Sequence, residues 1–144
     1  MAGVRFSQIN LVAHNLDETL AFYRRLGLDI GRESVWRTHS GAHHATAATE
    51  GEVDLEFDSQ KFAQVYNAGF SAERGRVVIG LSLESREAVD LAWAGLIAEG
   101  AQGLQPPFDA FWGARYAIIE DPDGNPVGLM SPIDPTRRGP PPEL

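Results

Sequence analysis

Three carboxylates alternate along the segment EVDLEFD, residues 52–58. Because successive side chains of a β-strand point to opposite faces, Asp54, Glu56 and Asp58 are expected to share one face. Burial and neighbouring negative charge both raise the pKa of a carboxyl group, which would suit Glu56 to act as a general base. A strand with one solvated face shows the same alternation. Both interpretations stay open, and Glu56 is the candidate catalytic residue.

Aromatic residues form a second candidate group. A planar ligand could stack on them, although large aromatic side chains also serve in cores and subunit interfaces. The candidates are Trp36, Phe108, Trp112 and Tyr116. Arg115, next to Tyr116, could bind an anionic ligand or pair with a carboxylate such as Asp109. The pairing with a carboxylate is the simpler interpretation.

Three histidines lie close together in THSGAHH, residues 38–44. His39, His43 and His44 could supply metal ligands, but adjacent histidines on a strand point to opposite faces and SGA is typical of a turn. A solvated turn is therefore the favoured interpretation. The chain has no cysteine, so any metal must be held by His, Asp, Glu or Gln.

Composition excludes several classes of function. The 144 residues are 43% hydrophobic, enough for one compact domain. Twenty acidic residues against 12 basic ones give a net charge of −8, which disfavours nucleic acid and anionic membrane surfaces as partners. No apolar stretch approaches the length of a membrane span, so we expect a cytoplasmic protein.

The order of elements predicts two similar halves. A strand is expected from Val4 to Val12, and then a helix that Asn15 caps with Glu18 three residues later and that Gly27 ends. Strands follow at 30–38, 43–49 and 53–57. In the second half we expect a strand at 77–83, a helix that Ser85 caps and Gly100 ends, and a strand at 103–105. A loop at 108–113 and a hairpin at 114–131, with an Asp-Gly turn, complete the chain.

Superposing the halves with an offset of 70 residues aligns Ile9 with Ile79, Leu11 with Leu81 and Asn15 with Ser85. This indicates an internal duplication. The predicted fold class is α+β, with two tandem βαβββ modules that form a cupped mixed sheet with helices on the outer face. Module 1 spans about 4–58, a linker 59–76 and module 2 77–132. The proline-rich tail 133–144 is expected to be poorly ordered.

The paired modules, the helix end FYRRLGL and the closing segment FWGARYAIIEDPDGNPVGL resemble the vicinal oxygen chelate superfamily. This is the group of glyoxalases, bleomycin resistance proteins and extradiol dioxygenases, and the segments are most similar to its glyoxalase-like branch. The resemblance implies a ligand-binding cup between the modules and a homodimer. Exposed edge strands also favour dimerisation.

The resemblance places the family's four metal-ligand positions at Gln8, Glu56, Val78 and Gly128. Strand alternation independently turns all four toward the cup. Val78 and Gly128 offer no donor atom, and Gln8 with Glu56 supplies only two oxygens, fewer than a divalent metal usually needs. We therefore expect no metal and no other cofactor.

Three functions follow from these observations. The first is binding of a small organic molecule, partly aromatic or cationic, in a metal-free cup, as the bleomycin-resistance branch does. The expected ligand-binding residues are Gln8, Trp36, Asp54, Glu56, Phe108, Trp112, Arg115 and Tyr116. The alternative is a metal-dependent lyase, isomerase or dioxygenase of the glyoxalase type, with further ligands from elsewhere. The third is a module that acts only through its dimer surface. The sequence identifies neither the ligand nor a reaction.

Overall fold

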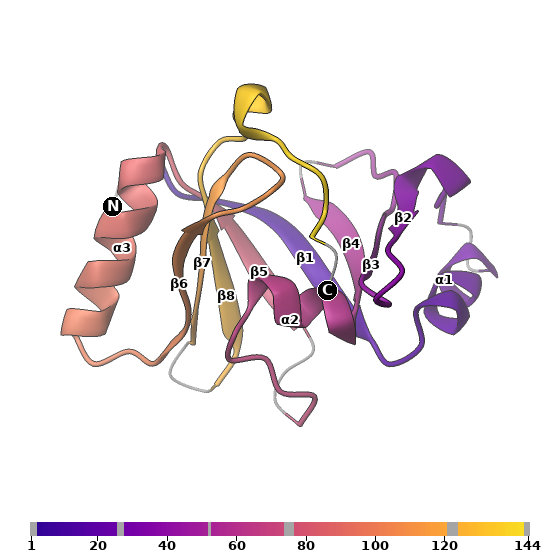
Figure 1. Ribbon diagram of the computed structural model, residues 1–144, viewed down its shortest axis with the longest axis horizontal. Helices are drawn as coiled ribbons and strands as arrows, with labels where there is room; N and C mark the ends of the chain where they lie inside the picture. Colours follow the sequence, from indigo (N-terminus) through magenta and orange to yellow (C-terminus); the bar gives the residue numbers. More distant parts are fainter. Residues whose placement is uncertain (1–2, 26–27, 52, 74–76, 121–123, 143–144) are drawn as a thin grey trace.

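A computed structural model describes residues 3–25, 28–51, 53–73, 77–120 and 124–142. In this part of the chain, strands from both halves join into one mixed sheet that curls into a cup (Figure 1). The strands are β1 Arg5–Ala13, β2 Val35–Arg37, β3 His43–Thr46, β4 Asp54–Ser59, β5 Val77–Ser82, β6 Gly103–Asp109, β7 Arg115–Glu120 and β8 Pro126–Met130. The predicted α+β fold class is confirmed.

The sheet order β2-β3-β4-β1-β5-β8-β7-β6 displays the internal duplication. Strands β1 and β5 pair antiparallel at the centre, with Ile9 opposite Ile79. Each then pairs in parallel with the last strand of its own module, β1 with β4 and β5 with β8. The two modules are thus related by a pseudo-twofold axis between β1 and β5, as the sequence offset predicts.

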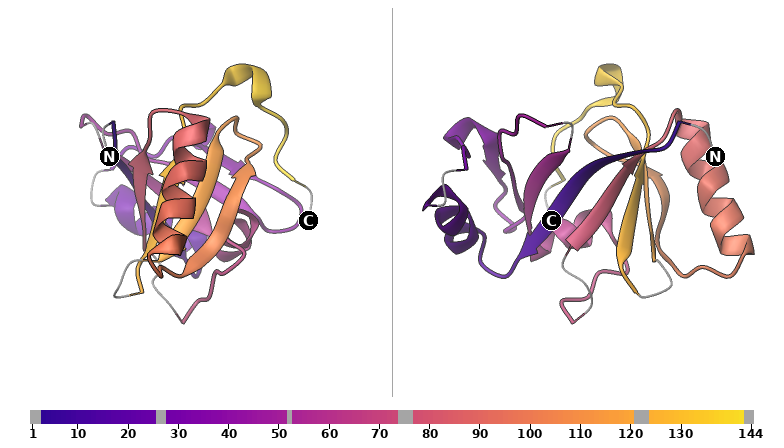
Figure 2. Two further views of the ribbon diagram at one scale, coloured as in Figure 1. Left: turned by 90° about the vertical axis from the view of Figure 1, so that its left-hand side faces the viewer. Right: turned by 180° about the vertical axis from the view of Figure 1, so that it is seen from behind.

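Two helices cover the outer, convex face (Figure 2). Helix α1, Leu16–Arg25, begins where Asn15 Oδ1 accepts a hydrogen bond from the Glu18 amide at 3.1 Å. Helix α3, Arg86–Ala98, begins at Ser85, whose hydroxyl accepts from the Ala88 amide. Both predicted caps are confirmed. Gly100 has a φ of +98° just after α3, as expected of a helix-ending glycine. Gly27 lies outside the described residues.

The strand faces follow the predicted alternation. Leu20 and Leu129 are almost fully buried, and Leu11, Leu55, Leu81 and Leu96 pack in the same layers between the sheet and helices α1 and α3. Val12 and Val78 lie on the opposite, concave face. This confirms the register that turns Glu56 into the cup, because Glu56 is adjacent in sequence to Leu55 and lies on the other face.

The segment predicted as a linker contains a further helix, α2 Gln60–Tyr66, which packs on the concave side of the sheet. Ser59 caps this helix through the Phe62 amide at 3.2 Å. Phe62, Ala63 and Tyr66 are buried on one face of α2. Their spacing brings these side chains together at the bottom of the cup, with Val12 and Val78.

Several predicted boundaries need correction. The strand expected at 30–38 is shorter, because a 3₁₀ turn, Arg32–Ser34, precedes β2. The loop expected to begin at Phe108 is instead strand through Asp109. Strand β6 tolerates Pro106 and Pro107 because it is an edge strand and its register shifts between Gln105 and Phe108, where the two prolines lie. Residues 121–123 of the hairpin turn lie outside the described part.

The tail also differs from expectation. It forms a 3₁₀ turn at Pro135–Arg137, and the amides of Asp134 and Gly139 donate to the carbonyls of Gly113 and Phe111 at 3.0 and 2.8 Å. These contacts attach the tail to the loop before β7, at the mouth of the cup.

The predicted homodimer stays a prediction. No helix among the described residues is long and apolar enough to cross a membrane.

Candidate ligand-binding cup

The concave face of the sheet encloses a cavity of about 370 Å³. One wall is polar and comes from module 1. Its residues are Gln8, Asn10, His44, Thr46, Asp54 and Glu56. The other walls are aromatic and come from both modules and α2. Their residues are Trp36, Phe62, Tyr66, Phe111, Trp112 and Tyr116. Met130 and Ile133 complete the lining, and a volume of this size suits a small organic molecule.

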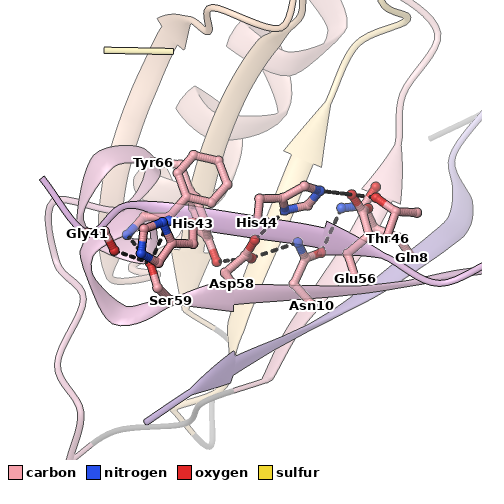
Figure 3. A network of polar contacts seen from close by, with 11 residues as sticks. Gln8, Asn10, Gly41, His43, His44, Thr46, Glu56, Asp58, Ser59 and Tyr66 are labelled. Atoms are coloured by element: carbon pink, nitrogen blue, oxygen red, sulfur yellow. Dashed lines mark hydrogen bonds and ion pairs between the residues drawn. The ribbon is translucent and has the colours of Figure 1, made fainter. Parts of the chain in front are cut away.

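Asp58 is the buried centre of the polar wall, with no exposure to solvent. Its carboxylate accepts hydrogen bonds from Asn10 Nδ2 at 3.0 Å, Tyr66 Oη at 2.9 Å and His44 Nδ1 at 2.5 Å (Figure 3). Gln8 Nε2 in turn donates to Asn10 Oδ1 at 2.6 Å. A buried carboxylate is stable only when it is paired and hydrogen-bonded, and three donors satisfy Asp58.

His44 bridges two carboxylates. Nδ1 faces Asp58 and Nε2 lies 3.1 Å from Glu56 Oε1, with Thr46 Oγ1 at 3.2 Å from the same nitrogen. A ring with carboxylates at both nitrogens donates from both, so His44 is an imidazolium. Burial acts to lower the pKa of His44, but hydrogen bonds and charge from Asp58 and Glu56 outweigh it and raise the pKa to about 9. Glu56 is therefore held as the partner of an internal cation.

Two buried tyrosines face the same charges. Tyr66 donates to Asp58, whereas Tyr116 lies across the cup on β7 with its ring against Trp112 and Phe108. Burial, and then the negative charge of Asp58, raises the pKa of both phenols well above the ordinary value; Glu56 contributes as well. Both tyrosines thus keep their protons throughout the neutral range.

The aromatic walls form a continuous set of edge-to-face contacts. Trp36 meets Phe62 at 4.8 Å between ring centroids and Phe111 at 5.9 Å. Trp112 meets Tyr116 at 5.3 Å and donates from Nε1 to Met130 Sδ at 3.3 Å. These contacts hold the rings in fixed orientations, so the cavity is largely formed before any ligand enters.

The four positions that the resemblance assigns to metal ligands do lie together. Gln8 on β1 pairs with Gly80 on β5, and Gly80 pairs in turn with Gly128 on β8. Asn10, two residues after Gln8, pairs with Glu56 on one side and with Val78 on the other. The donor set does not fit a metal, however. Val78 is packed in the apolar cluster at the bottom of the cup, and Gly128 has no side chain. Among the described residues, no three His, Asp or Glu side chains converge to hold a metal ion.

Most of the predicted ligand-binding residues line the cavity. Gln8, Trp36, Asp54, Glu56, Trp112 and Tyr116 do so. Phe108 does not, because its ring packs behind Trp112 and Tyr116. Arg115 points away from the cavity and pairs with Asp90 at 2.9 Å and with Asp109 at 3.3 Å. The expected contact of Arg115 with a ligand is thus corrected in favour of the carboxylate pairing.

Sequence reasoning missed the central role of His44. A solvated turn is right for His39, which is exposed, but wrong for His43 and His44, which are half-buried on β3. His44 lies opposite Asp58 in the register and faces the cup, whereas His43 faces the other side. Strand alternation from Ala45, a fully buried residue of the outer layer, would have indicated this. Asn10, Tyr66 and Phe111 were also missed.

Comparison with known proteins identifies the family. Residues 5–129 match the profile of the Glyoxalase/Bleomycin resistance protein/Dioxygenase superfamily. The chain belongs to this superfamily. No curated protein sequence matches it significantly.

Solved structures share this superfamily fold at low sequence identity. A hypothetical protein from Bacillus halodurans is 18% identical with a TM-score of 0.62, over 91% of this chain and 96% of that one. A superfamily member from Vibrio splendidus is 10% identical with a TM-score of 0.57, over 90% and 99%. Methylmalonyl-CoA epimerase from Streptomyces coelicolor, bound to 2-nitronate-propionyl-CoA, is 19% identical with a TM-score of 0.58, over 88% and 96%.

Proposed function

We propose that this protein binds a small organic cation with a planar aromatic group in its cup, and that binding needs no metal. The observation that carries the proposal is the unequal composition of the cavity walls. Carboxylates and amides lie on one side and aromatic rings on the others. Among the described residues that line the cavity, none is lysine or arginine.

Charge favours a cationic ligand. Asp54, Glu56 and Asp58 carry three negative charges, and the His44 imidazolium balances one of them. Two negative charges remain uncompensated beside the cavity. Asp54 is exposed at its edge, and the Glu56 side chain is 16% exposed. An anionic ligand would meet repulsion there, whereas a cation gains both from the carboxylates and from the faces of Trp36 and Trp112.

On the polar wall, Gln8 and Glu56 also present acceptors to the cavity. Gln8 commits its Nε2 to Asn10, which leaves its carbonyl oxygen for a ligand. Glu56 meets His44 through Oε1, which leaves Oε2. A ligand with N–H donors or a delocalised positive charge complements these groups.

Metal-free binding is supported by the chemistry of the donor set. Val78 and Gly128 provide no lone pair, and the imidazolium of His44 already meets the Glu56 carboxylate. A divalent ion at Glu56 would have to displace an internal cation and would find one neutral amide oxygen, from Gln8, as its next donor.

The test uses the ring-methylated nicotinamide cation, whose ring nitrogen carries a methyl group and the positive charge. Saturable quenching of tryptophan emission is expected, because Trp36 and Trp112 line the cavity. Trp112→Phe should reduce the quenching, with the remainder coming from Trp36. Trp93→Phe is the matched control. Trp93 lies on α3 and packs in the outer layer, so its replacement should leave the quenching by the ligand unchanged. Glu56→Gln should weaken binding several-fold. Quenching without saturation, or equal loss in both tryptophan variants, would refute the proposal.

A further inference from the structure

Tyr116 is a closely packed aromatic side chain of the cup. It is 6% exposed, and three rings meet it edge to face, with centroids at 5.3 Å for Trp112, 5.9 Å for Tyr66 and 6.2 Å for Phe108. These contacts fix the direction of the ring, so the position of its hydroxyl is set by packing.

The hydroxyl lies over the backbone of Gly128 on the neighbouring strand β8. A Cβ atom added to Gly128 would be 2.6 Å from the Tyr116 hydroxyl oxygen, closer than real Cβ contacts allow. The hydroxyl therefore occupies the space into which a side chain at residue 128 would extend. A polar group from β7 takes the place of one from β8, on the cup face of the same sheet.

This hydroxyl has no hydrogen-bond partner among the described residues, unlike that of Tyr66, which donates to Asp58. In the described part of the chain, only His43 Nδ1 and one Arg86 nitrogen are side-chain polar atoms that are both without a partner and closed off from solvent. The Tyr116 oxygen is not one of them, so it keeps some accessible surface, and the cavity that Tyr116 lines provides it. Burial and nearby carboxylates keep the phenol protonated, so it can donate.

We infer that Tyr116 is a specificity-determining residue whose hydroxyl donates a hydrogen bond to an uncharged acceptor, such as an amide or ketone carbonyl, on the bound ligand. The inference deepens the proposed function and rests on it for the location of the ligand. The ligand class becomes an aromatic cation that also carries a neutral carbonyl group. A carboxylate in place of the carbonyl is disfavoured, because Asp58 and Glu56 impose a negative potential on Tyr116.

Three probes separate the two features of the ligand. The ring-methylated nicotinamide cation has both the charge and the carbonyl, N-methylpyridinium has only the charge, and nicotinamide has only the carbonyl. Each is titrated by calorimetry into the unmodified protein and into the Tyr116→Phe variant. This substitution keeps the ring and its packing, and matching urea-unfolding midpoints would verify that the fold is unchanged.

Loss of one neutral hydrogen bond should weaken binding about three- to ten-fold for both carbonyl probes, and less than about two-fold for N-methylpyridinium. Equal weakening of all three probes, or of none, would overturn the inference and leave the proposed function intact. Binding of nicotinamide alone, sensitive to Tyr116→Phe, would support the inference and overturn the cationic function. Failure of all three to bind up to millimolar concentration would overturn both.

Discussion

The hydroxyl of Tyr116 and the Cα of Gly128 lie so close together that a Cβ on residue 128 would be 2.6 Å from the hydroxyl oxygen. This relationship links Gly128 on β8, a metal-ligand position of the family that has no side chain here, to an aromatic residue on β7. The two positions are coupled, because a larger residue at 128 requires a smaller one at 116.

The coupling predicts a non-additive effect on stability. Gly128→Ala should lower the free energy of unfolding by about 1–3 kcal/mol through overpacking. In a Tyr116→Phe background the cost should be smaller, because the oxygen at 2.6 Å is gone and the nearest remaining ring atom is at 3.2 Å. Urea unfolding of the four proteins in a double-mutant cycle measures the difference.

Gly95→Ala is the control for this cycle. Gly95 lies in α3, where an added Cβ meets nothing within 4 Å, so alanine should stabilise the helix by about 1 kcal/mol. Equal costs of Gly128→Ala in both backgrounds would contradict the contact between residues 116 and 128.

The two buried tyrosines should differ in their response to loss of the hydroxyl. Tyr66→Phe removes a donor from the fully buried Asp58 carboxylate and should cost about 1.5–3 kcal/mol. Tyr116→Phe removes a hydroxyl that no described residue bonds, so the free energy of unfolding should change by less than about 0.5 kcal/mol. Chemical denaturation compares the two variants directly, and a larger cost for Tyr116→Phe would be inconsistent with the hydrogen bonds assigned to Asp58.

Because of His44, the free energy of unfolding should decrease as the pH rises into the alkaline range. Its pKa is raised from 6.5 to about 9 in the folded protein, so the folded state binds the proton more tightly than the unfolded state. The stabilisation is fully present below pH 6.5 and is lost as the pH rises through 9. One pKa unit corresponds to about 1.4 kcal/mol, so roughly 3 kcal/mol should be lost across this range.

Urea unfolding between about pH 6 and pH 10, with NMR titration of the ring nitrogens, measures this effect. His44→Gln should abolish the pH dependence contributed by this group and lower stability at pH 6, because Asp58 loses its cation. His14→Gln is the control, since His14 is exposed and bonds only Gln60 among the described residues. A midpoint for His44 near 6.5 would show that it is not held between the two carboxylates.

The outer layer of the fold could be predicted from the sequence, because helix caps and strand alternation are local signals. Asn15, Ser85 and the alternation around Leu81 placed both long helices and the central strands. The cup face could be predicted only in part. Glu56 faces the cup as alternation requires. Its ion pair with His44, however, depends on the register between β3 and β4, which local sequence patterns do not determine.

Two further features were not predicted from the sequence, for different physical reasons. Helix α2 is short, and its sequence between two modules invited a linker interpretation, although Ser59 and the spacing of Phe62 and Tyr66 carry a helix signal. The close approach of Tyr116 to Gly128 arises from antiparallel pairing of β7 and β8, in which residue 118 lies directly opposite 128 and residue 116 reaches it diagonally. Such diagonal contacts require the three-dimensional twist of the sheet.

The central claim is that the cup binds an aromatic cation without a metal. Its most direct test is calorimetric titration of the ring-methylated nicotinamide cation into protein purified without an affinity tag, before and after treatment with EDTA. We predict one-site binding with the same affinity in both samples, weakened several-fold by Glu56→Gln. Binding that disappears with EDTA and returns with a stoichiometric divalent metal would contradict the account.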